Sequence, residues 1–535
     1  MIKNCFFFLI IFFNYHVLSQ NNCKKAFKKI SKIEKSIQEN KEGAFEEILK
    51  LESYCSDEYF KIKIGDIYYR YEKYGKLVNF YVKNWSIYYP EEVLLQFLKS
   101  CIYSNNYKIA LDIIKLYPKG YKYTQEINEL IQQNIFAVSK IQKPDLINIK
   151  RLPFSSNKDE YFPSITSDTS ALIYTRRDVQ DENFYLVNLV NKNWSEPKIL
   201  KFPSNTIYNE GAYSISSDCK EVFFASCNRE DGYGNCDLYY AEIINDSLWS
   251  EPINLGPSIN TKAWESQPSI SLDNKFLFFS SNRDGGFGRR DIWCSVRLDK
   301  YSWSEPFNLG SNVNTVKDEI TPFIFYDSNK LYFSSSGHIG MGGYDLFVSN
   351  LHNGFFEKAH NLGFPINSNK DESSLIFTKN NQTAFLASNR GPGFDLDLYT
   401  FYLPENMQSN KFIEIGGIVL DSISLKPVNN CKIIFYNQDS FYFKTYSNSE
   451  GYFIIDLNGR FTSAKISYIG YMPKLVDLIL QDDNNTIKLF PESLNADEIT
   501  VTGLRRKSYI KDTPVMTRVI STEDIENSGA NSVKD

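Results

Sequence analysis

Apolar side chains recur with two different periods along this chain of 535 residues. Between residues 21 and 143 they lie three or four positions apart, as at Ile64, Ile67 and Tyr71, which places them on one face of a helix. Beyond this region the pattern changes to short apolar runs bounded by Gly, Pro, Asn and Asp, which is typical of strands. We therefore predict a helical array followed by a longer β region.

Two helix-sized segments of the array end in Tyr-Pro, at Tyr89-Pro90 and Tyr117-Pro118. They resemble degenerate helix pairs of the tetratricopeptide type, which implies a stack of repeats over residues 21–143. Stacked repeats bury their aromatic stripe between helices, so we expect this stripe to form core. A ligand groove is the alternative.

The β region, residues 144–403, repeats a segment that is most complete from Ser280 to Trp293 (SSNRDGGFGRRDIW). Each copy has an apolar run, a Gly-rich turn and an Asp-hydrophobic-aromatic strand. Other copies occupy residues 225–239, 334–347 and 387–399, with a weaker one at 174–185.

Three further signatures recur in phase with these copies. One glutamate per repeat lies 50 to 55 residues from the next: Glu160, Glu210, Glu265, Glu319 and Glu372. An aspartate follows each Gly-rich turn: Asp237, Asp291, Asp345 and Asp397. The motif Trp-Ser-Glu-Pro begins at Trp194, Trp249 and Trp303. Residues that recur once per repeat usually serve the fold, so we interpret them as structural and the carboxylates as acceptors for turn amides. Ligand or metal contact is the alternative.

Each period holds four short strands, which the third repeat places at residues 268–271, 276–280, 291–297 and 303–309. Four strands per unit make a β-propeller blade, so five phases predict five blades. The fifth repeat lacks its last strand, and residues 147–152 precede the first repeat without a partner. We expect this segment to complete the fifth blade and close the ring. The repeats resemble the TolB-type, WD-like propeller repeats of bacterial envelope proteins.

The Gly-rich turns join strand to strand and open no helix, so the sequence does not predict phosphate-binding loops. His338 lies in a turn that lacks the Asn-Arg pair of the other copies. This departure indicates either a specialised blade or sequence drift.

Residues 404–412 are interpreted as a linker to a second β unit, residues 413–492. Its alternating strands predict a small antiparallel sandwich of about seven strands. Pro427-Val428, Ser449–Phe453 and Ser467–Tyr471 resemble a carboxypeptidase-regulatory-like domain, which implies no zinc chemistry.

Residues 493–535 resemble the start of the plug of a TonB-dependent outer-membrane receptor, and a disordered tail is the alternative. The match to the segment before such plugs consists of Asp497, Glu498, Ile499, Thr500, Val501, Thr502 and Gly503. Residues 514–525 match the first strand and helix of a plug. A plug and a 22-stranded barrel need far more residues, so the resemblance implies a fragment of a longer receptor or a reading frame that ends early.

The first twenty residues predict a secretory signal peptide, with Lys3 before an apolar run and Ser19 near its end. Cys23 follows Gln20-Asn21-Asn22 rather than the small residues that precede a lipid-modified cysteine, so we do not expect a lipid anchor. A net charge of −5 and the lack of a long Lys/Arg run argue against a nucleic-acid partner.

Export permits disulfides. Cys227 and Cys236 bracket one Gly-rich turn and are a candidate pair, and Cys55 and Cys101 are a second. Free buried thiols are the alternative. The chain has no Cys-x-x-Cys pair and four scattered histidines, so no metal site is expected.

The sequence also lacks the Gly-x-Ser-x-Gly and His-Glu-x-x-His motifs, so neither catalytic residues nor a cofactor are predicted. The resemblances imply a non-catalytic binding or scaffold protein of the periplasm and outer membrane, the periplasmic extension of a TonB-dependent receptor. Its expected partners are outer-membrane or periplasmic proteins, with TonB as one candidate. The alternative is a peripheral scaffold of a type IX-like secretion or OmpA-associated complex, which the domain order also resembles.

Overall fold

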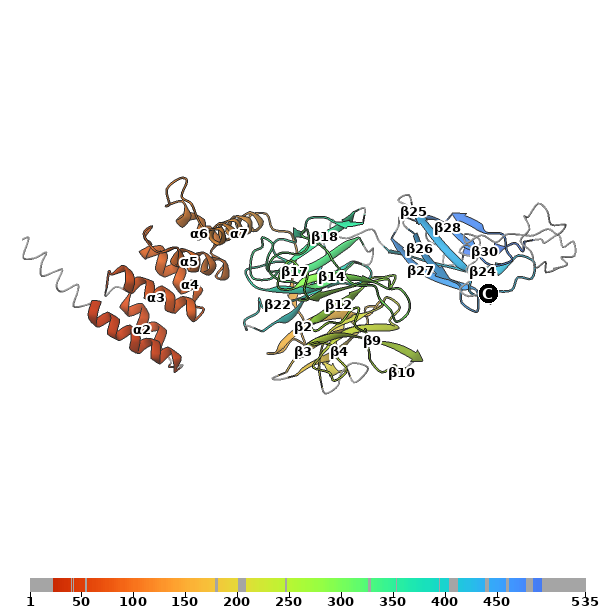
Figure 1. Ribbon diagram of the computed structural model, residues 1–535, viewed down its shortest axis with the longest axis horizontal. Helices are drawn as coiled ribbons and strands as arrows, with labels where there is room; N and C mark the ends of the chain where they lie inside the picture. Colours follow the sequence, from red (N-terminus) through yellow and green to blue (C-terminus); the bar gives the residue numbers. More distant parts are fainter. Residues whose placement is uncertain are drawn as a thin grey trace, which may run out of the picture. The chain divides into compact units, whose positions relative to one another are not determined.

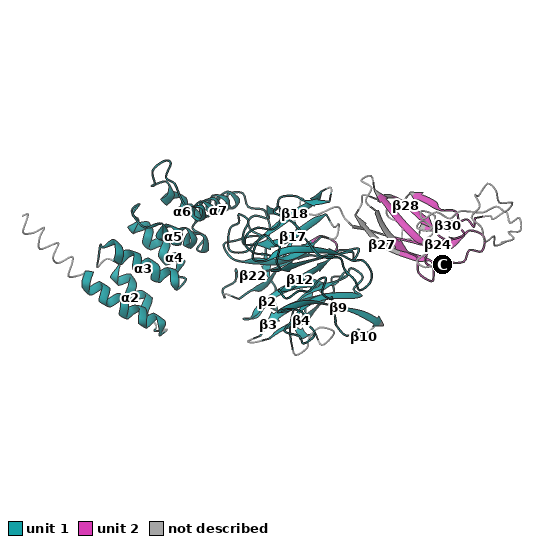
Figure 2. Cartoon of the chain, viewed as in Figure 1, with its two compact units in different colours: residues 1–378, 383–404 teal, residues 379–382, 405–535 magenta. Residues whose placement is uncertain are grey.

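The computed structural model describes residues 23–492 apart from 40, 42, 53–54, 179–180, 201–207, 246–247, 326–328, 353, 394, 404–411, 438–441, 459–460 and 478–484. The predicted signal peptide, nearly all of the predicted linker and the plug-like residues 493–535 lie outside this described part. Figure 2 shows two compact units: residues 1–378 with 383–404, and residues 379–382 with 405–535.

Helices form the first part of unit 1 (Figure 1). Asp57 begins one of them: its Oδ1 accepts a hydrogen bond from the Phe60 backbone N–H at 2.9 Å, a standard N-cap. The apolar faces share one core, in which Phe60, Tyr68 and Phe97 are fully buried. The helices are residues 23–38, α2 (Ala44–Leu51), α3 (Glu58–Arg70), α4 (Tyr74–Asn84), α5 (Glu91–Tyr103), α6 (Tyr107–Ile114) and α7 (Gln125–Ile141). None of the helices in the described residues is long and apolar enough to cross a membrane.

The rest of unit 1 is built from antiparallel sheets, five of them within the described residues. Sheet 1 comprises β2 (Asp159–Ile165), β3 (Ala171–Arg177), β4 (Glu182–Val190), β5 (Asn193–Trp194) and β6 (Lys198–Ile199). Sheet 2 comprises β7 (Asn209–Ile215), β8 (Glu221–Cys227), β9 (Cys236–Asn245), β10 (Leu248–Trp249) and β11 (Ile253–Asn254). Sheet 3 comprises β12 (Glu265–Ile270), β13 (Phe276–Ser281), β14 (Asp291–Val296) and β15 (Phe307–Asn308). Sheet 4 comprises β16 (Glu319–Ile324), β17 (Lys330–Ser335), β18 (Asp345–His352), β19 (Phe355–Phe356) and β20 (His360–Asn361). Sheet 5 comprises β21 (Glu372–Phe377), β22 (Thr383–Ser388), β23 (Asp397–Tyr402) and β1 (Lys150–Arg151).

The first strands of these sheets form a closed ring. β2 contacts β7, β7 contacts β12, β12 contacts β16, β16 contacts β21, and β21 returns to β2. Sheets that radiate from a central ring of strands are the architecture of a β-propeller.

Strand β1 closes the ring, as the sequence predicts for residues 147–152. Lys150 pairs with Thr400 and Arg151 with Tyr399, so the strand that follows the helices completes the last sheet. The Leu152 N–H donates to the Leu398 carbonyl at 2.8 Å, and the Arg151 guanidinium lies 2.6 Å from the Asp397 carboxylate.

Unit 2 is a two-layered β-sandwich with seven strands in its described residues. One sheet has the order β27-β24-β30 and the other the order β26-β25-β28-β29. β24 and β30 are parallel, so the prediction of an entirely antiparallel sandwich is wrong. The last strand reaches β24 from the opposite sheet rather than by a hairpin, and a sequence pattern does not reveal such a crossing. The strands are β24 (Phe412–Asp421), β25 (Lys432–Asn437), β26 (Tyr442–Tyr446), β27 (Tyr452–Asn458), β28 (Phe461–Ser467), β29 (Lys474–Asp477) and β30 (Asn485–Leu489).

Two disulfides are present in the described residues, Cys23–Cys55 and Cys227–Cys236. The predicted pairing of Cys55 with Cys101 is therefore wrong, because Cys55 bonds the start of the first helix and Cys101 is a free, buried thiol on α5.

Candidate functional site

A cavity of about 90 Å³ lies within the ring of innermost strands. Residues near the middle of β2, β7, β12, β16 and β21 line it, among them Pro163, Ala212, Pro268, Pro322 and Leu375. The lining residues, all in the described part of the chain, are apolar, hydroxyl-bearing or amide side chains, without a carboxylate, amine, imidazole or thiol. Such walls favour binding by shape and hydrogen bonds over proton transfer.

Each innermost strand has a bulge at the cavity wall, because its pairing with the second strand shifts register there. One non-glycine residue per bulge has the left-handed conformation, which is costly for residues with a Cβ. A bulge bends its strand and increases the twist, so the same bend occurs five times around the ring. The residues and their φ angles are Phe162 (51°), Ala212 (58°), Gln267 (61°), Thr321 (52°) and Ser374 (56°).

Side chains at or beside these bulges bond neighbouring sheets to one another. The Thr321 N–H donates to Gln267 Oε1 at 2.8 Å, and the Ser374 N–H donates to Thr321 Oγ1 at 3.1 Å. The Ala212 N–H donates to Thr175 Oγ1 of sheet 1 at 3.2 Å. Every one of these bonds runs from an amide of one sheet to a side chain of the preceding sheet. The wall of the cavity is thus held by bonds between sheets as well as by packing.

The five signature glutamates begin or nearly begin the innermost strands and are fully buried. Glu265 accepts from the Thr261 N–H and hydroxyl at 2.8 and 2.9 Å, and from the Ser281 hydroxyl at 2.8 Å. A Thr or Ser four residues earlier bonds Glu319, Glu372 and Glu160 in the same way; these partners are Thr315, Ser368 and Ser156. Ser226 donates to Glu210 at 3.4 Å. These carboxylates stabilise the loops between sheets and do not line the cavity.

Arginines pair with three of the glutamates. Arg176, Arg283 and Arg390 lie 3.0, 3.2 and 3.0 Å from Glu160, Glu265 and Glu372. Arg283 and Arg390 also donate to the carbonyls of Ile259 and Ile366.

In sheet 4 the ring of His338 takes this place, with Nε2 2.8 Å from the Val313 carbonyl. Burial lowers the pKa of His338 and raises the pKa of Glu319, so both groups favour the neutral form. In sheet 4, an imidazole thus occupies the place that an arginine occupies in sheets 1, 3 and 5.

The signature aspartates hold the Gly-rich turns. Asp291 accepts from the N–H groups of Phe287 and Gly288 at 2.5 and 3.0 Å, and from Asn308 Nδ2 at 2.7 Å. Asp237 and Asp345 make the same turn contacts, whereas Asp397 pairs with Arg151. Burial raises the pKa of Asp237 and of Asp345.

Three buried asparagines complete this network, and the sequence reasoning did not assign them a role. Asn314 accepts from the Ile292 N–H at 2.8 Å and donates to the Ile292 carbonyl at 3.0 Å, as a paired strand would. Asn260 and Asn367 do the same with Leu238 and Leu346. Each follows the Asn of an Asn-Leu-Gly motif by six residues, and that constant spacing was the available signal.

The signature tryptophans pack between sheets. The rings of Trp303 and Phe223 lie 5.9 Å apart, and those of Trp194 and Phe385 lie 6.2 Å apart. Trp249 packs against the cluster that contains Phe184 and Phe224. Trp303 and Trp194 thus contact the sheet that precedes their own around the ring.

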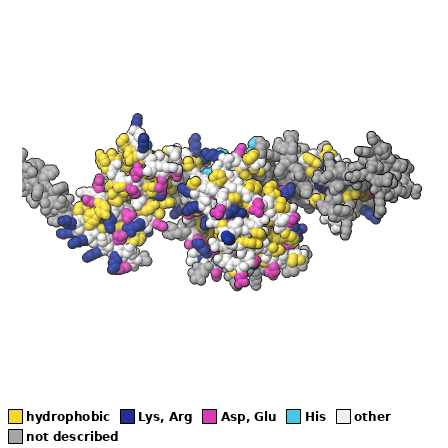
Figure 3. Space-filling view, in the orientation of Figure 1, with side chains coloured by type: hydrophobic (Ala, Val, Ile, Leu, Met, Phe, Trp, Pro, Cys, Tyr) yellow, Lys and Arg dark blue, Asp and Glu magenta, His cyan; other side chains and the backbone are white. Residues whose placement is uncertain are grey.

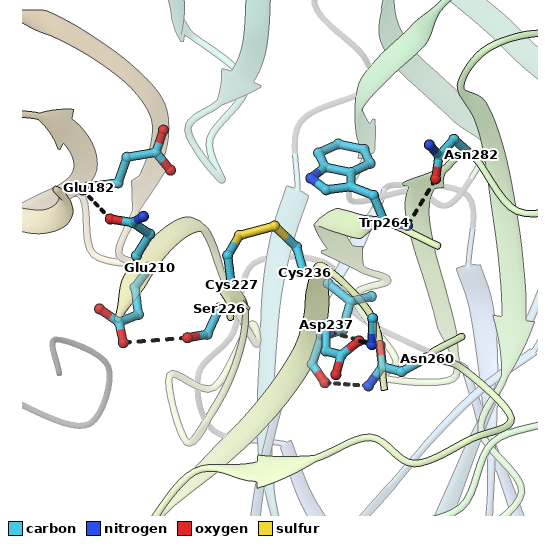
Figure 4. Close-up of a disulfide and its surroundings, with 12 residues drawn as sticks. Glu182, Glu210, Ser226, Cys227, Cys236, Asp237, Asn260, Trp264 and Asn282 are labelled. Carbon is cyan, nitrogen blue, oxygen red and sulfur yellow. Dashed lines mark hydrogen bonds between the residues drawn. A yellow bond between two sulfur atoms is a disulfide. The ribbon is translucent and has the colours of Figure 1, made fainter. Parts of the chain in front are cut away.

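The Cys227–Cys236 disulfide joins β8 to β9 at the base of the Gly-rich turn of sheet 2 (Figure 4). Figure 4 shows it between the Glu210–Ser226 bond and the loop that carries Trp264. In sheet 3 the position of Cys227 is occupied by Asn282, whose Oδ1 accepts from the Trp264 N–H at 2.9 Å. The disulfide closes the turn of sheet 2, whereas the residue at the matching position in sheet 3 bonds the segment before β12.

Among the described residues, the Gly-rich turn of sheet 4 contacts the helices. Met341 of sheet 4 is fully buried in the helical core, and the Tyr107 hydroxyl donates to its carbonyl at 2.8 Å. Gln133 of α7 donates to the Gly342 carbonyl at 2.9 Å, and Asn369 donates to the Tyr103 carbonyl at 2.7 Å. The residues at the matching positions of sheets 2 and 3, Tyr233 and Phe287, are about half exposed. The turn around His338 is thus the docking turn for the helices, which the sequence did not predict.

No cluster of three His, Cys, Asp or Glu that could hold a metal ion occurs among the residues the structure describes. The plug-like residues Asp497 to Gly503 lie outside them.

No family model matches the chain, and no curated protein matches its sequence. Solved structures are similar over about half of it. TolB from Acinetobacter baumannii is 15% identical over 46% of this chain and 55% of its own, with a TM-score of 0.30. An alpha-L-arabinofuranosidase from Lactobacillus brevis is 13% identical over 48% of this chain and 94% of its own, with a TM-score of 0.34. An oligogalacturonate lyase from Vibrio parahaemolyticus is 11% identical over 50% of this chain and 96% of its own, with a TM-score of 0.28. The match spans about half the length of the TolB protein, and TM-scores of this size carry no argument about function.

Proposed function

We propose that this chain is an exported, non-catalytic binding and scaffold protein of the cell envelope, built around a five-bladed propeller of TolB type. The observation that carries this proposal is that the recurrent charged residues of the ring lie outside the cavity. The recurrent carboxylates bond loops, turns and arginines outside the cavity, while the cavity is walled by prolines, aliphatic and aromatic side chains, hydroxyls and one amide. A rigid, mostly apolar cavity with a few polar groups suits a binding role.

The envelope location and the link to a TonB-dependent receptor rest on the sequence. The predicted signal peptide supports export, and the resemblances of residues 413–492 and 493–535 support attachment to an outer-membrane receptor through a carboxypeptidase-regulatory-like domain. On this proposal the helices, of tetratricopeptide type, and the propeller are periplasmic surfaces for outer-membrane or periplasmic proteins.

Site-specific photo-crosslinking in the living cell tests the binding role. Replacing Phe323, which lines the cavity, with p-benzoylphenylalanine should give a discrete adduct with an envelope protein or ligand. The same residue placed at Tyr402, which is 78% exposed on β23, is the control and should give none.

Equal labelling at the two positions, or no adduct at Phe323, would count against a binding site in the cavity. The purified chain can also be tested for turnover of a glycan or peptide library. Turnover that a bulky substitution in the cavity wall abolishes would show that the protein is an enzyme and would contradict the proposal.

A further inference from the structure

The first helix, residues 23–38, has a lysine-rich face that the propeller does not explain. Its sequence, CKKAFKKISKIEKSIQ, contains six lysines and one acid, in a chain whose net charge is −5. The lysines are Lys24, Lys25, Lys28, Lys29, Lys32 and Lys35, and all six side chains are exposed. Figure 3 shows basic side chains gathered over this part of the helical region.

Helical geometry places these lysines together. At about 100° per residue they fall within an arc of about 140°, and no acid lies in that arc. The apolar residues Ala26, Ile30, Ile33 and Ile37 fall on the opposite side and are buried in the helical core. The helix is therefore fixed with its apolar face inward and its lysine face outward.

Two contacts hold this orientation. The Cys23–Cys55 disulfide ties the start of the helix to the loop before α3. Glu34, the only acid of the helix, lies 2.6 Å from the Arg70 guanidinium and 3.9 Å from the Lys63 amine. Because Glu34 is paired with cations from α3, its charge does little to offset the lysine face.

We propose that this lysine face binds the anionic surface of a lipid bilayer. The lysines from Lys24 to Lys35 span about 16 Å along a straight helix, which suits a flat layer of phosphate headgroups. Anionic membrane surfaces attract such clusters by about 1 kcal/mol for each basic residue near the surface. With its apolar side in the core, the helix binds electrostatically, without insertion.

The lysine composition favours a membrane over a nucleic acid. Arginine binds single phosphates with two parallel hydrogen bonds, and the lysine face contains no arginine. Lysine acts as a mobile point charge and responds to the summed charge of a surface. The proposal does not depend on what the propeller binds, so either can fail without the other.

Vesicle sedimentation with the chain from residue 21 onward, without the predicted signal peptide, tests the proposal. Vesicles with phosphatidylglycerol should bind the protein at low salt, and vesicles of phosphatidylcholine alone should not. The triple variant Lys24→Gln, Lys28→Gln, Lys32→Gln should lower the partition coefficient by about a hundredfold. Each lysine contributes a factor of about five, and the three factors multiply. Raising the salt from about 0.05 M to 0.5 M should release the wild type because the Debye length shrinks.

The matched control is Lys115→Gln, Lys119→Gln, Lys122→Gln, three exposed lysines elsewhere in the helical region with the same change in net charge. It should bind nearly as the wild type does. An equal loss in the two triple variants would overturn the proposal in favour of a net-charge effect. Absence of binding to phosphatidylglycerol vesicles, or tighter binding to a DNA duplex than to these vesicles, would also overturn it. Circular dichroism of both variants shows that the helices remain folded.

Discussion

At the scale of the residue, the buried glutamates show how one position in a repeat can be stabilised in two ways. Glu265 has hydrogen bonds from Thr261 and Ser281 and an ion pair with Arg283. Glu319 has the equivalent hydrogen bonds from Thr315 and Ser335, but an imidazole replaces the arginine. The same sequence signature therefore carries different electrostatics in sheets 3 and 4.

The first prediction compares Glu319→Gln with Glu265→Gln. Glutamine has one acceptor oxygen where glutamate has two, so Glu319→Gln should cost about 1–3 kcal/mol at pH 7. Glu265→Gln should cost more, about 3–5 kcal/mol, because it also leaves the Arg283 guanidinium buried without its anion. Chemical denaturation of the two variants measures both values. Equal costs would contradict the role given to Arg283.

The pH dependence of stability in the wild type and in Glu319→Gln supplies a second measurement. The pKa of Glu319 is raised in the fold by burial, so the native state binds its proton more tightly than the unfolded chain does. This contribution is fully present below the usual glutamate pKa near 4.5 and is lost as pH rises through the raised value. Above pH 4.5 the wild type should therefore lose stability with rising pH more steeply than Glu319→Gln. If stability falls equally steeply with rising pH in the wild type and in Glu319→Gln, Glu319 is not the titrating group.

At the scale of the element, four related Gly-rich turns have separate tasks. An aspartate holds the turns of sheets 2, 3 and 4 alike, but the turn of sheet 2 is also closed by a disulfide and that of sheet 4 docks the helices through Met341. The turn of sheet 5 is tied to β1 because Asp397 pairs with Arg151. A shared backbone pattern thus leaves the side chains at the tip free to differ.

The second prediction concerns the docking turn. Met341→Asp would place a charge in the helical core, at a cost of several kcal/mol, and should release the helices from the propeller. Hydrogen exchange at α6 and α7 should then quicken by about tenfold or more. Phe287→Asp, the same change at the matching exposed position of sheet 3, should leave exchange unaffected. Release by both variants would contradict a specific role for Met341.

At the scale of the whole molecule, ring closure joins residues that are far apart in sequence. β1 follows α7 and pairs with β23, so the same segment ends the helical array and completes the propeller. The helices also dock on sheets 4 and 5 through Met341 and Asn369. Unit 1 is therefore a single compact body in which damage to the closure affects helices and sheets together.

The third prediction tests the closure. Arg151→Glu removes the ion pair with Asp397 and adds a like charge beside a carboxylate that is 4% exposed. Because the Arg151 side chain is 40% exposed, the expected cost is about 1–2 kcal/mol rather than that of a fully buried pair. Lys150→Glu makes the same charge change at the neighbouring exposed residue and should cost less than about 0.5 kcal/mol. Thermal unfolding of the two variants measures the difference; similar values would argue that Arg151 does not hold the ring.

The sequence predicted those features that depend on a repeated local pattern. The strand expected at residues 276–280 is β13, Phe276–Ser281, and the segment expected to close the ring contains β1. Features that depend on how the helices pack were not predicted. Cys55 pairs with Cys23 because the fold of the helices brings them together, and Met341 is buried because the helices lie against its turn. Neither has a counterpart in the other repeats, so comparing copies could not reveal it.

The order of the strands also affects how the ring folds. β1 leaves the ribosome or a translocon about 250 residues before β23, which is its only partner strand in the described sheets. At a synthesis rate of about 5–20 residues per second, this strand waits roughly 10–50 s with an unpaired edge. Pairings over so long a stretch of chain form slowly, because the entropy of closing the loop must be overcome first. Assembly of this protein is therefore expected to finish with a slow step, and a chaperone that shields β1 during the wait should raise its folding yield.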